Sequence, residues 1–297
     1  WIEHDYQQRV WKHEEIARMR FKELRPFYQE TANAFVAGVK QYMNEHPEKI
    51  PEHSLELESY YLLTLARSSA VWWVLEQAWR DFLGEWCWDA KEDWGKTYFA
   101  NQAKKMGGSN AWAVMPQRTA NNHVITLLDP HVGWSNDELP WEGHLHGGSL
   151  HVYGFQWVGL PYMTIGHNEH ISWTVTALGA DTADVYELTL NPDNSLQYLY
   201  DGEWRGLNPE RITISVKTEK GIEQLGRNVF YSHYGPVVQK NNNKAYAFKI
   251  AYDNELVGHL EPYGQLNKAK NLTEFLHVLS LKAFTPMNWM YGDVEGN

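Results

Sequence analysis

A Gly-Gly-Ser-Asn run at residues 107–110 is the clearest candidate for chemistry in the chain. A serine hydroxyl is a weak nucleophile unless a base lies beside it, and one solution makes serine the first residue of a chain, so that its own α-amine accepts the proton. The ordinary pKa of that amine is about 8, against about 10.4 for lysine, so part of it is free base at neutral pH. Gly108 allows the unusual backbone conformations that attack of the Ser109 hydroxyl on the Gly108 carbonyl requires. The run suggests self-cleavage between Gly108 and Ser109, although these four residues alone are more typical of a turn before an edge strand.

A second candidate is the histidine-rich segment 142–151, which contains Glu142, His144, His146 and His151. In a strand, His144 and His146 point to one face, and this spacing can bind zinc or iron in metal-dependent β-barrel enzymes. No carboxylate follows at the spacing that such a site needs. A metal enzyme that uses His144, His146 and His151 therefore stands as an alternative.

The aromatic content suggests a third class of protein. The chain has 15 tryptophans, and a binding module that stacks aromatic rings on sugars would need many of them. The same side chains also bury large areas in a core and line the walls of apolar clefts. We favour a core and an apolar cleft, and keep the aromatic-rich binding module as an alternative.

Charge and hydropathy exclude two classes of partner. The net charge is −11 and no cluster of lysine and arginine is visible, which argues against a nucleic-acid partner because such binding relies on cationic clusters. No apolar run approaches the roughly 18 to 20 residues of a membrane span. Cys87 is the single cysteine and forms no disulfide within the chain. The chain begins at Trp1 without a leader pattern, so we expect a longer natural polypeptide.

The elements that must position Ser109 change in character along the chain. Apolar residues recur at helical spacing over 5–45, with an interruption at Pro26, and again over 55–83, where Gly84 is a plausible stop, so we expect three helices. After Gly108, β-rich runs alternate with turn residues, and a helix is expected over about 271–281, capped by Asn271 or Thr273. Strands are expected at 124–128, 150–158, 171–176, 211–216, 228–232, 235–238 and 244–250. This order predicts an α+β fold.

Residues 108–114 resemble the start of the β-subunit in the penicillin acylase family of N-terminal nucleophile hydrolases. Further motifs follow in that family's order, at 129–131 with Trp134, 159–161, 166–168, 171–176, Asp181 with Asp184, 233–236 and 293–297. The likeness is strong over 109–297 and weaker over 5–51. It implies a four-layer αββα sandwich, divided into a helical α-subunit region (1–108, truncated at its N-terminus) and the nucleophile core of the β-subunit (109–297, truncated at its C-terminus).

The resemblance assigns roles to three residues. Ser109 corresponds to the nucleophile, freed by cleavage after Gly108, with its own amine as base. His131 corresponds to a residue close to the nucleophile, although a structural histidine that caps a turn beside Pro130 is an alternative reading. Ala177 corresponds to the residue whose backbone N–H is one oxyanion-hole donor. The family's second donor is an Asn side chain beyond residue 297, so we expect the 297 residues alone to be inactive.

The resemblance also implies a metal, a partner and a substrate. Asp181 and Asp184, with the carbonyl of Ala183, match positions that hold one structural Ca²⁺ in many relatives, although paired aspartates before a strand are ordinary; Glu76 is a weak candidate for a further ligand. No organic cofactor is implied. The partner is the other half of the chain's own precursor, in an α/β heterodimer that is periplasmic or secreted. The substrate is a small acyl-amide: an N-acyl homoserine lactone, a β-lactam side chain or a lipopeptide.

Overall fold

The computed structural model describes residues 2–52, 54–83, 108–132, 140–241, 243–251 and 260–297. The chain divides into two compact units, each built from three segments. The first unit comprises Trp1–Glu14, Val71–Ala103 and Asp181–Asp253, and the second comprises Glu15–Ala70, Lys104–Ala180 and Asn254–Asn297. Of the residues discussed above, Trp1, Gly84, Cys87, Gly107 and Trp134, and the side chain of Glu76, lie outside the described part.

In the described part of the N-terminal third the α-helices are α1 (Ile2–Val10), α2 (His13–Phe21), α3 (Pro26–Glu45) and α4 (Tyr61–Leu83). The expectation of a single helix before Pro26 is wrong, because the chain breaks between α1 and α2. Lys12 has a φ of 51° there, in the left-handed region that ends a helix. Pro26 occupies the first turn of α3, where its missing N–H costs no helical hydrogen bond.

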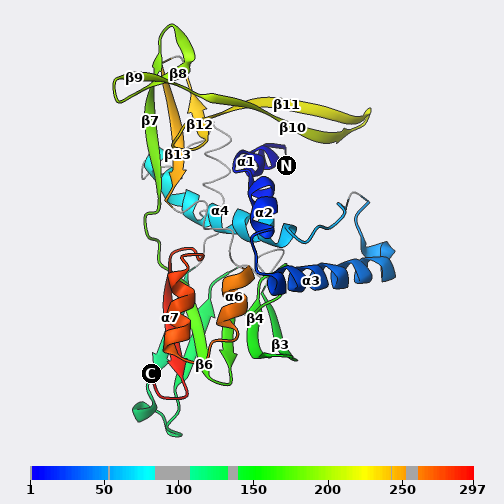
Figure 1. Ribbon diagram of the computed structural model, residues 1–297, viewed down its shortest axis with the longest axis vertical. Helices are drawn as coiled ribbons and strands as arrows, with labels where there is room; N and C mark the ends of the chain where they lie inside the picture. Colours follow the sequence, from blue (N-terminus) through cyan, green and yellow to red (C-terminus); the bar gives the residue numbers. More distant parts are fainter. Residues whose placement is uncertain (1, 53, 84–107, 133–139, 242, 252–259) are drawn as a thin grey trace. The chain divides into compact units, whose positions relative to one another are not determined.

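A five-stranded antiparallel sheet forms the centre of the second unit (Figure 1). Its order is β14-β6-β5-β4-β3, so the last strand of the chain pairs with a strand more than a hundred residues earlier. The strands are β3 (Trp141–Gly147), β4 (Leu150–Gln156), β5 (Ile165–Asn168), β6 (Ile171–Ala177) and β14 (Met287–Asp293).

Helices cover one face of this sheet. Trp173 of β6 is 1% exposed, and its indole N–H donates to the carbonyl of Thr164 at 3.0 Å. Two further helices contribute to the same core: α6 (Leu260–Leu266) and α7 (Leu272–Ser280), whose Phe275 ring lies 5.9 Å from the ring of Trp289. Asn271 caps α7 by accepting from the backbone N–H of Glu274, which confirms Asn271 as the predicted cap.

A two-stranded hairpin lies against the other face. It consists of β1 (Ser109–Val114) and β2 (Ile125–Pro130), and it packs on β6 and β14. The contact is close because β14 presents a glycine: a methyl group on Gly292 would lie 2.5 Å from Cγ1 of Val124 and 3.2 Å from Cγ2 of Thr126. The absent side chain therefore sets how near β2 and the residue before it, the partners of the strand that carries Ser109, come to the sheet.

The first unit contains a second five-stranded sheet, of order β12-β13-β7-β8-β9, and a two-stranded arm made of β10 and β11 (Figure 1). A small core of apolar side chains, including Leu188, Leu190 and Tyr198, covers the sheet. The arm packs on α1, where the Tyr6 hydroxyl donates to the carbonyl of Leu225 at 2.8 Å. The strands are β7 (Ala183–Asn191), β8 (Asn194–Tyr200), β9 (Glu203–Gly206), β10 (Asn208–Thr218), β11 (Gly221–Tyr231), β12 (Val237–Lys240) and β13 (Lys244–Ile250).

The structure confirms the α+β class, with several antiparallel sheets and segregated helices. Each expected strand coincides with or overlaps an observed one, and β10 and β11 are longer than expected. The strands expected from the sequence do not include β1, β3, β5, β7, β8, β9 or β14, and α6 was not expected either. No helix in the described part of the chain is long and apolar enough to cross a membrane.

Candidate active site

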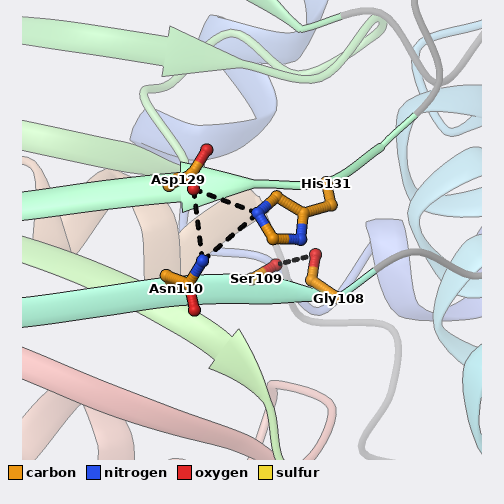
Figure 2. A network of polar contacts seen from close by, with 5 residues as sticks. All are labelled: Gly108, Ser109, Asn110, Asp129 and His131. Carbon is orange, nitrogen blue, oxygen red and sulfur yellow. Dashed lines mark hydrogen bonds and ion pairs between the residues drawn. The ribbon is translucent and has the colours of Figure 1, made fainter.

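The β1–β2 hairpin brings Ser109 and His131 to the same end of the hairpin (Figure 2). In its register Asn110 lies opposite Asp129 and Ser109 lies opposite Pro130, so His131, one residue beyond β2, faces Gly108. Pro130 carries no N–H. Its pair with Ser109 is a position where antiparallel strands exchange no hydrogen bonds, so the proline removes no hydrogen bond between β1 and β2. For the same reason the Ser109 N–H points away from β2.

The carbonyl oxygen of Gly108 accepts two hydrogen bonds. The backbone N–H of His131 donates to it at 2.8 Å, and the Ser109 hydroxyl donates to it at 2.7 Å. The first bond withdraws charge from the carbonyl and is placed to stabilise negative charge that would develop on this oxygen. The second shows that the hydroxyl lies beside the carbonyl group that it would have to attack.

A polar network fixes the ring of His131 (Figure 2). Oδ2 of Asp129 lies 3.0 Å from Nε2 of His131 and 3.2 Å from Nδ2 of Asn110, and these two nitrogens are 3.3 Å apart. The hydrogen bonds from His131 and then Asn110 lower the pKa of Asp129, so its carboxyl group is ionised at neutral pH. Nδ1 of His131 is on the side of Gly108, where a methyl group would lie 3.5 Å from it.

Ala177 lies in the same unit, at the C-terminal end of β6 and opposite Met287 of β14. The N–H of Leu178 donates to the carbonyl of Pro286, so Leu178 and Pro286, the residues next to this pair, form a hydrogen-bonded pair. Because such pairs alternate along an antiparallel ladder, the N–H of Ala177 points away from β14. It is therefore not used in that ladder and can serve as a donor.

Asp181, Ala183 and Asp184 lie in the first unit, where Ala183 begins β7 and is 1% exposed. The structure adds Asp81 of α4, which sequence reasoning missed. Burial, and then the charges of Asp181 and Asp184, raise the pKa of Asp81. No local pattern points to this neighbourhood, because about a hundred residues separate the helix from β7.

The three histidines of the metal alternative come together but do not form a metal centre. The ring of His146 lies 4.5 Å from that of His151 and 6.1 Å from that of His144, and the rings of His144 and His146 are parallel within 2°. His151 also pairs with Glu169, with Nδ1 and Oε1 3.3 Å apart. In the described ranges no three His, Cys, Asp or Glu side chains are placed to hold a metal ion. The structure therefore gives the metal-dependent barrel enzyme no support.

Comparison with known proteins decides the family. A family model described as penicillin amidase matches residues 1–297. The chain belongs to the penicillin amidase family. It is 35% identical over 176 residues to an acyl-homoserine lactone acylase PvdQ of Pseudomonas fluorescens (strain Pf0-1), a match that covers 56% of this chain and 22% of that protein. It is 30% identical over 191 residues to penicillin G acylase of Escherichia coli, covering 64% of this chain and 22% of that protein.

A solved structure supports the same assignment. The thermostable penicillin G acylase from Alcaligenes faecalis superposes with a TM-score of 0.58 and 29% sequence identity, over 63% of this chain and 33% of that chain. This penicillin amidase family member thus spans between about a fifth and a third of the relatives that it matches. Its relatives are named as acylases, which favours an enzyme over an aromatic-rich binding module.

Proposed function

We propose that the complete natural polypeptide carrying this chain is a self-processing acylase, which hydrolyses an acyl-amide bond through a serine acyl-enzyme. The observation that carries the proposal is the position of the Ser109 hydroxyl, 2.7 Å from the Gly108 carbonyl oxygen, with the His131 N–H on that same oxygen. Membership of a family whose relatives are named acylases supports the reaction class.

Processing begins with attack of the Ser109 hydroxyl oxygen on the Gly108 carbonyl carbon. The C–N bond then breaks, the Ser109 nitrogen takes up a proton to become an amine, and the acyl group rests on the serine oxygen as an ester. Water hydrolyses this ester and leaves a carboxylate on Gly108. Because the Ser109 nitrogen takes no part in the β1–β2 ladder, the new amine is free to act as a base.

In turnover the Ser109 oxygen attacks the substrate carbonyl while the amine of the same residue accepts the proton, and the amine later donates it to the leaving group. The N–H of Ala177 serves as one oxyanion-hole donor, a contribution typically worth about 3 kcal/mol of barrier.

For the substrate we propose an N-acyl homoserine lactone, a β-lactam side chain or a lipopeptide, and the Asp-Pro-His sequence at 129–131 favours the first and the last. The names of two relatives, acyl-homoserine lactone acylase and penicillin G acylase, agree with this range. We further propose the four-layer αββα arrangement, a mature α/β heterodimer cut after Gly108, and a periplasmic or secreted location.

One structural Ca²⁺ is also part of the proposal. Calcium prefers oxygen ligands, which the carboxylates of Asp181 and Asp184 and the carbonyl of Ala183 provide. Burial, and after it the charges of Asp181 and Asp184, raise the pKa of Asp81. A bound cation would offset the repulsion among these carboxyl groups, which supports the proposal. Further ligands are needed, because the described side chains do not form a cage by themselves.

A stability measurement tests the calcium site. Chelation with EGTA should lower the thermal unfolding midpoint of the wild-type protein, and Asp184→Asn should remove most of that response. Asp193→Asn, on an exposed turn of the same unit, is the control and should respond like wild type. An unfolding midpoint that does not depend on calcium in the wild-type protein would exclude the site.

The test of self-processing is the mass of the product. Expression of the complete polypeptide should give two fragments, the second beginning at Ser109, whereas Ser109→Ala should give one uncut chain without amidase activity. Ser149→Ala, in the exposed β3–β4 turn, is the matched control and should be cut normally. A wild-type protein that hydrolyses acyl-amides while the 108–109 bond stays intact would refute the proposal.

A further inference from the structure

The side chains around Ser109 point to a residue to which neither the family resemblance nor the proposed reaction assigns a role. We propose that Asp129, held in place by Asn110, is a positioning residue that orients the ring of His131 so that Nδ1 faces the Gly108–Ser109 bond. This inference rests on the proposed self-processing, since it concerns the rate of that cleavage.

The strand geometry makes the contact between Asp129 and His131 a local one. Residues two apart in extended chain point to the same side, and Pro130 between them restricts the backbone. Asn110 approaches from the neighbouring strand, as the register partner of Asp129. One carboxylate oxygen therefore receives both Nε2 of His131 and Nδ2 of Asn110, at 3.0 and 3.2 Å.

The carboxylate determines which nitrogen of His131 carries the proton. An ionised carboxylate only accepts hydrogen bonds, so Nε2 must be the donor. In the neutral ring Nδ1 is then the acceptor. The contact of 3.3 Å between Nδ2 of Asn110 and Nε2 of His131 fits this assignment, because both atoms donate to the same oxygen and lie side by side.

The free acceptor is on the side where the cleavage reaction needs a base. Nδ1 lies on the side of Gly108, where a methyl group would be in ordinary contact with it, at 3.5 Å (Figure 2). When the Ser109 oxygen bonds to the Gly108 carbon, Nδ1 takes the hydroxyl proton. The imidazolium returns this proton to the Ser109 nitrogen as the C–N bond breaks, so His131 ends unchanged. Before cleavage the Ser109 nitrogen is an amide and cannot do this itself.

Asp129→Asn is the decisive variant, because an amide can donate to Nε2 and favour the opposite tautomer, with Nδ1 protonated. A general base typically contributes about 10² to 10⁴-fold to a rate. Loss of the orientation of the His131 ring at this exposed site should remove part of that rate contribution, so we expect cleavage to slow by roughly 10 to 100-fold. Cell-free synthesis of the complete polypeptide, sampled over time on a denaturing gel, measures this rate.

A double-mutant cycle separates positioning from a structural role. His131→Ala removes the ring but keeps the backbone N–H on the Gly108 oxygen. In the His131→Ala background, Asp129→Asn should change the cleavage rate by less than about twofold, because the group through which it acts is gone. A structural effect of Asp129→Asn would persist there and would overturn the inference. Asp193→Asn is the matched control and should be cut at the wild-type rate.

Two further results keep the test decisive. If Asp129→Asn fails to fold, as judged by its thermal unfolding, Asn110→Ala replaces it, and a slower cleavage that disappears in the His131→Ala background has the same meaning. Wild-type cleavage of Asp129→Asn would refute the positioning role alone, with self-processing intact. An uncut wild-type protein would instead refute the proposed function.

Discussion

Gly292 should control how accurately the β1–β2 hairpin sits on the sheet, and Gly292→Ala tests this. The strand β14 presents Gly292 toward the hairpin that begins with Ser109. A methyl group at this position would lie 2.5 Å from Cγ1 of Val124, 3.1 Å from Oγ of Ser172 and 3.2 Å from Cγ2 of Thr126. The nearest of these atoms belongs to the connection that leads into β2.

The size of the effect follows from these distances. Carbon atoms in contact are ordinarily about 3.5 to 4.0 Å apart, so the hairpin must retreat by roughly 1 Å or distort. Overpacking of this kind typically costs about 1 to 3 kcal/mol of the free energy of unfolding. A displacement of about 1 Å at reacting groups can also cost about 10²-fold in rate. Cleavage at Ser109 should therefore slow by more than the loss of stability alone explains.

Urea unfolding and the rate of 108–109 cleavage are the two measurements. Gly147→Ala is a matched control, because Gly147 lies in β3 of the same sheet and a methyl group there meets no atom within 4 Å. Val124→Ala removes the clashing Cγ1, so the double variant Val124→Ala/Gly292→Ala should recover most of the cleavage rate. Equal stability and equal cleavage for Gly292→Ala and Gly147→Ala would show that the hairpin does not depend on this contact.

Two other positions allow predictions of stability. Asn267 is 1% exposed, accepts from the N–H of Met163 at 2.9 Å and donates to its carbonyl at 2.7 Å, so Asn267→Ala should leave two buried polar groups unpaired and cost about 2 to 4 kcal/mol in urea unfolding. Burial raises the pKa of Asp293, but hydrogen bonds from Asn297, Tyr291 and Glu295 outweigh it and hold the pKa below its ordinary value. Asp293→Ala should therefore cost about 2 to 4 kcal/mol at neutral pH. Because the folded pKa is lowered, this loss should shrink as the pH falls below about 4, and a constant difference between pH 7 and pH 3 would contradict the assignment.

Local chemistry explains which elements the sequence could predict. The helix α7 has a capping asparagine and an apolar stripe, and both signals lie within a few residues of one another. The break between α1 and α2 at Lys12 lacks such a signal, since neither glycine nor proline marks it. The strand β14 is covered on both faces, by α7 on one and by the hairpin on the other, so its residues do not alternate between apolar and polar.

The residues of the candidate site also differ in whether a local sequence signal identifies them. The nucleophile and its neighbouring histidine are recognisable because their roles depend on residue type and on a short motif. The role of Asn110 depends on the strand register, which places it opposite Asp129 across nineteen positions of chain. A shift of that register by one residue would turn the asparagine to the other side of the hairpin. The sequence of the segment 108–114 alone does not predict this register.

Asp129 lies between these two cases. Its spacing to His131 is visible in the sequence, and strand geometry alone would place the two side chains on one side. What the spacing does not reveal is which ring nitrogen meets the carboxylate, because the same two residues could meet through Nδ1 or Nε2. The structure selects Nε2, and this choice leaves Nδ1 beside the bond to be cut. A motif can therefore contain a residue that acts through its neighbour while giving no sign of which atom it acts on.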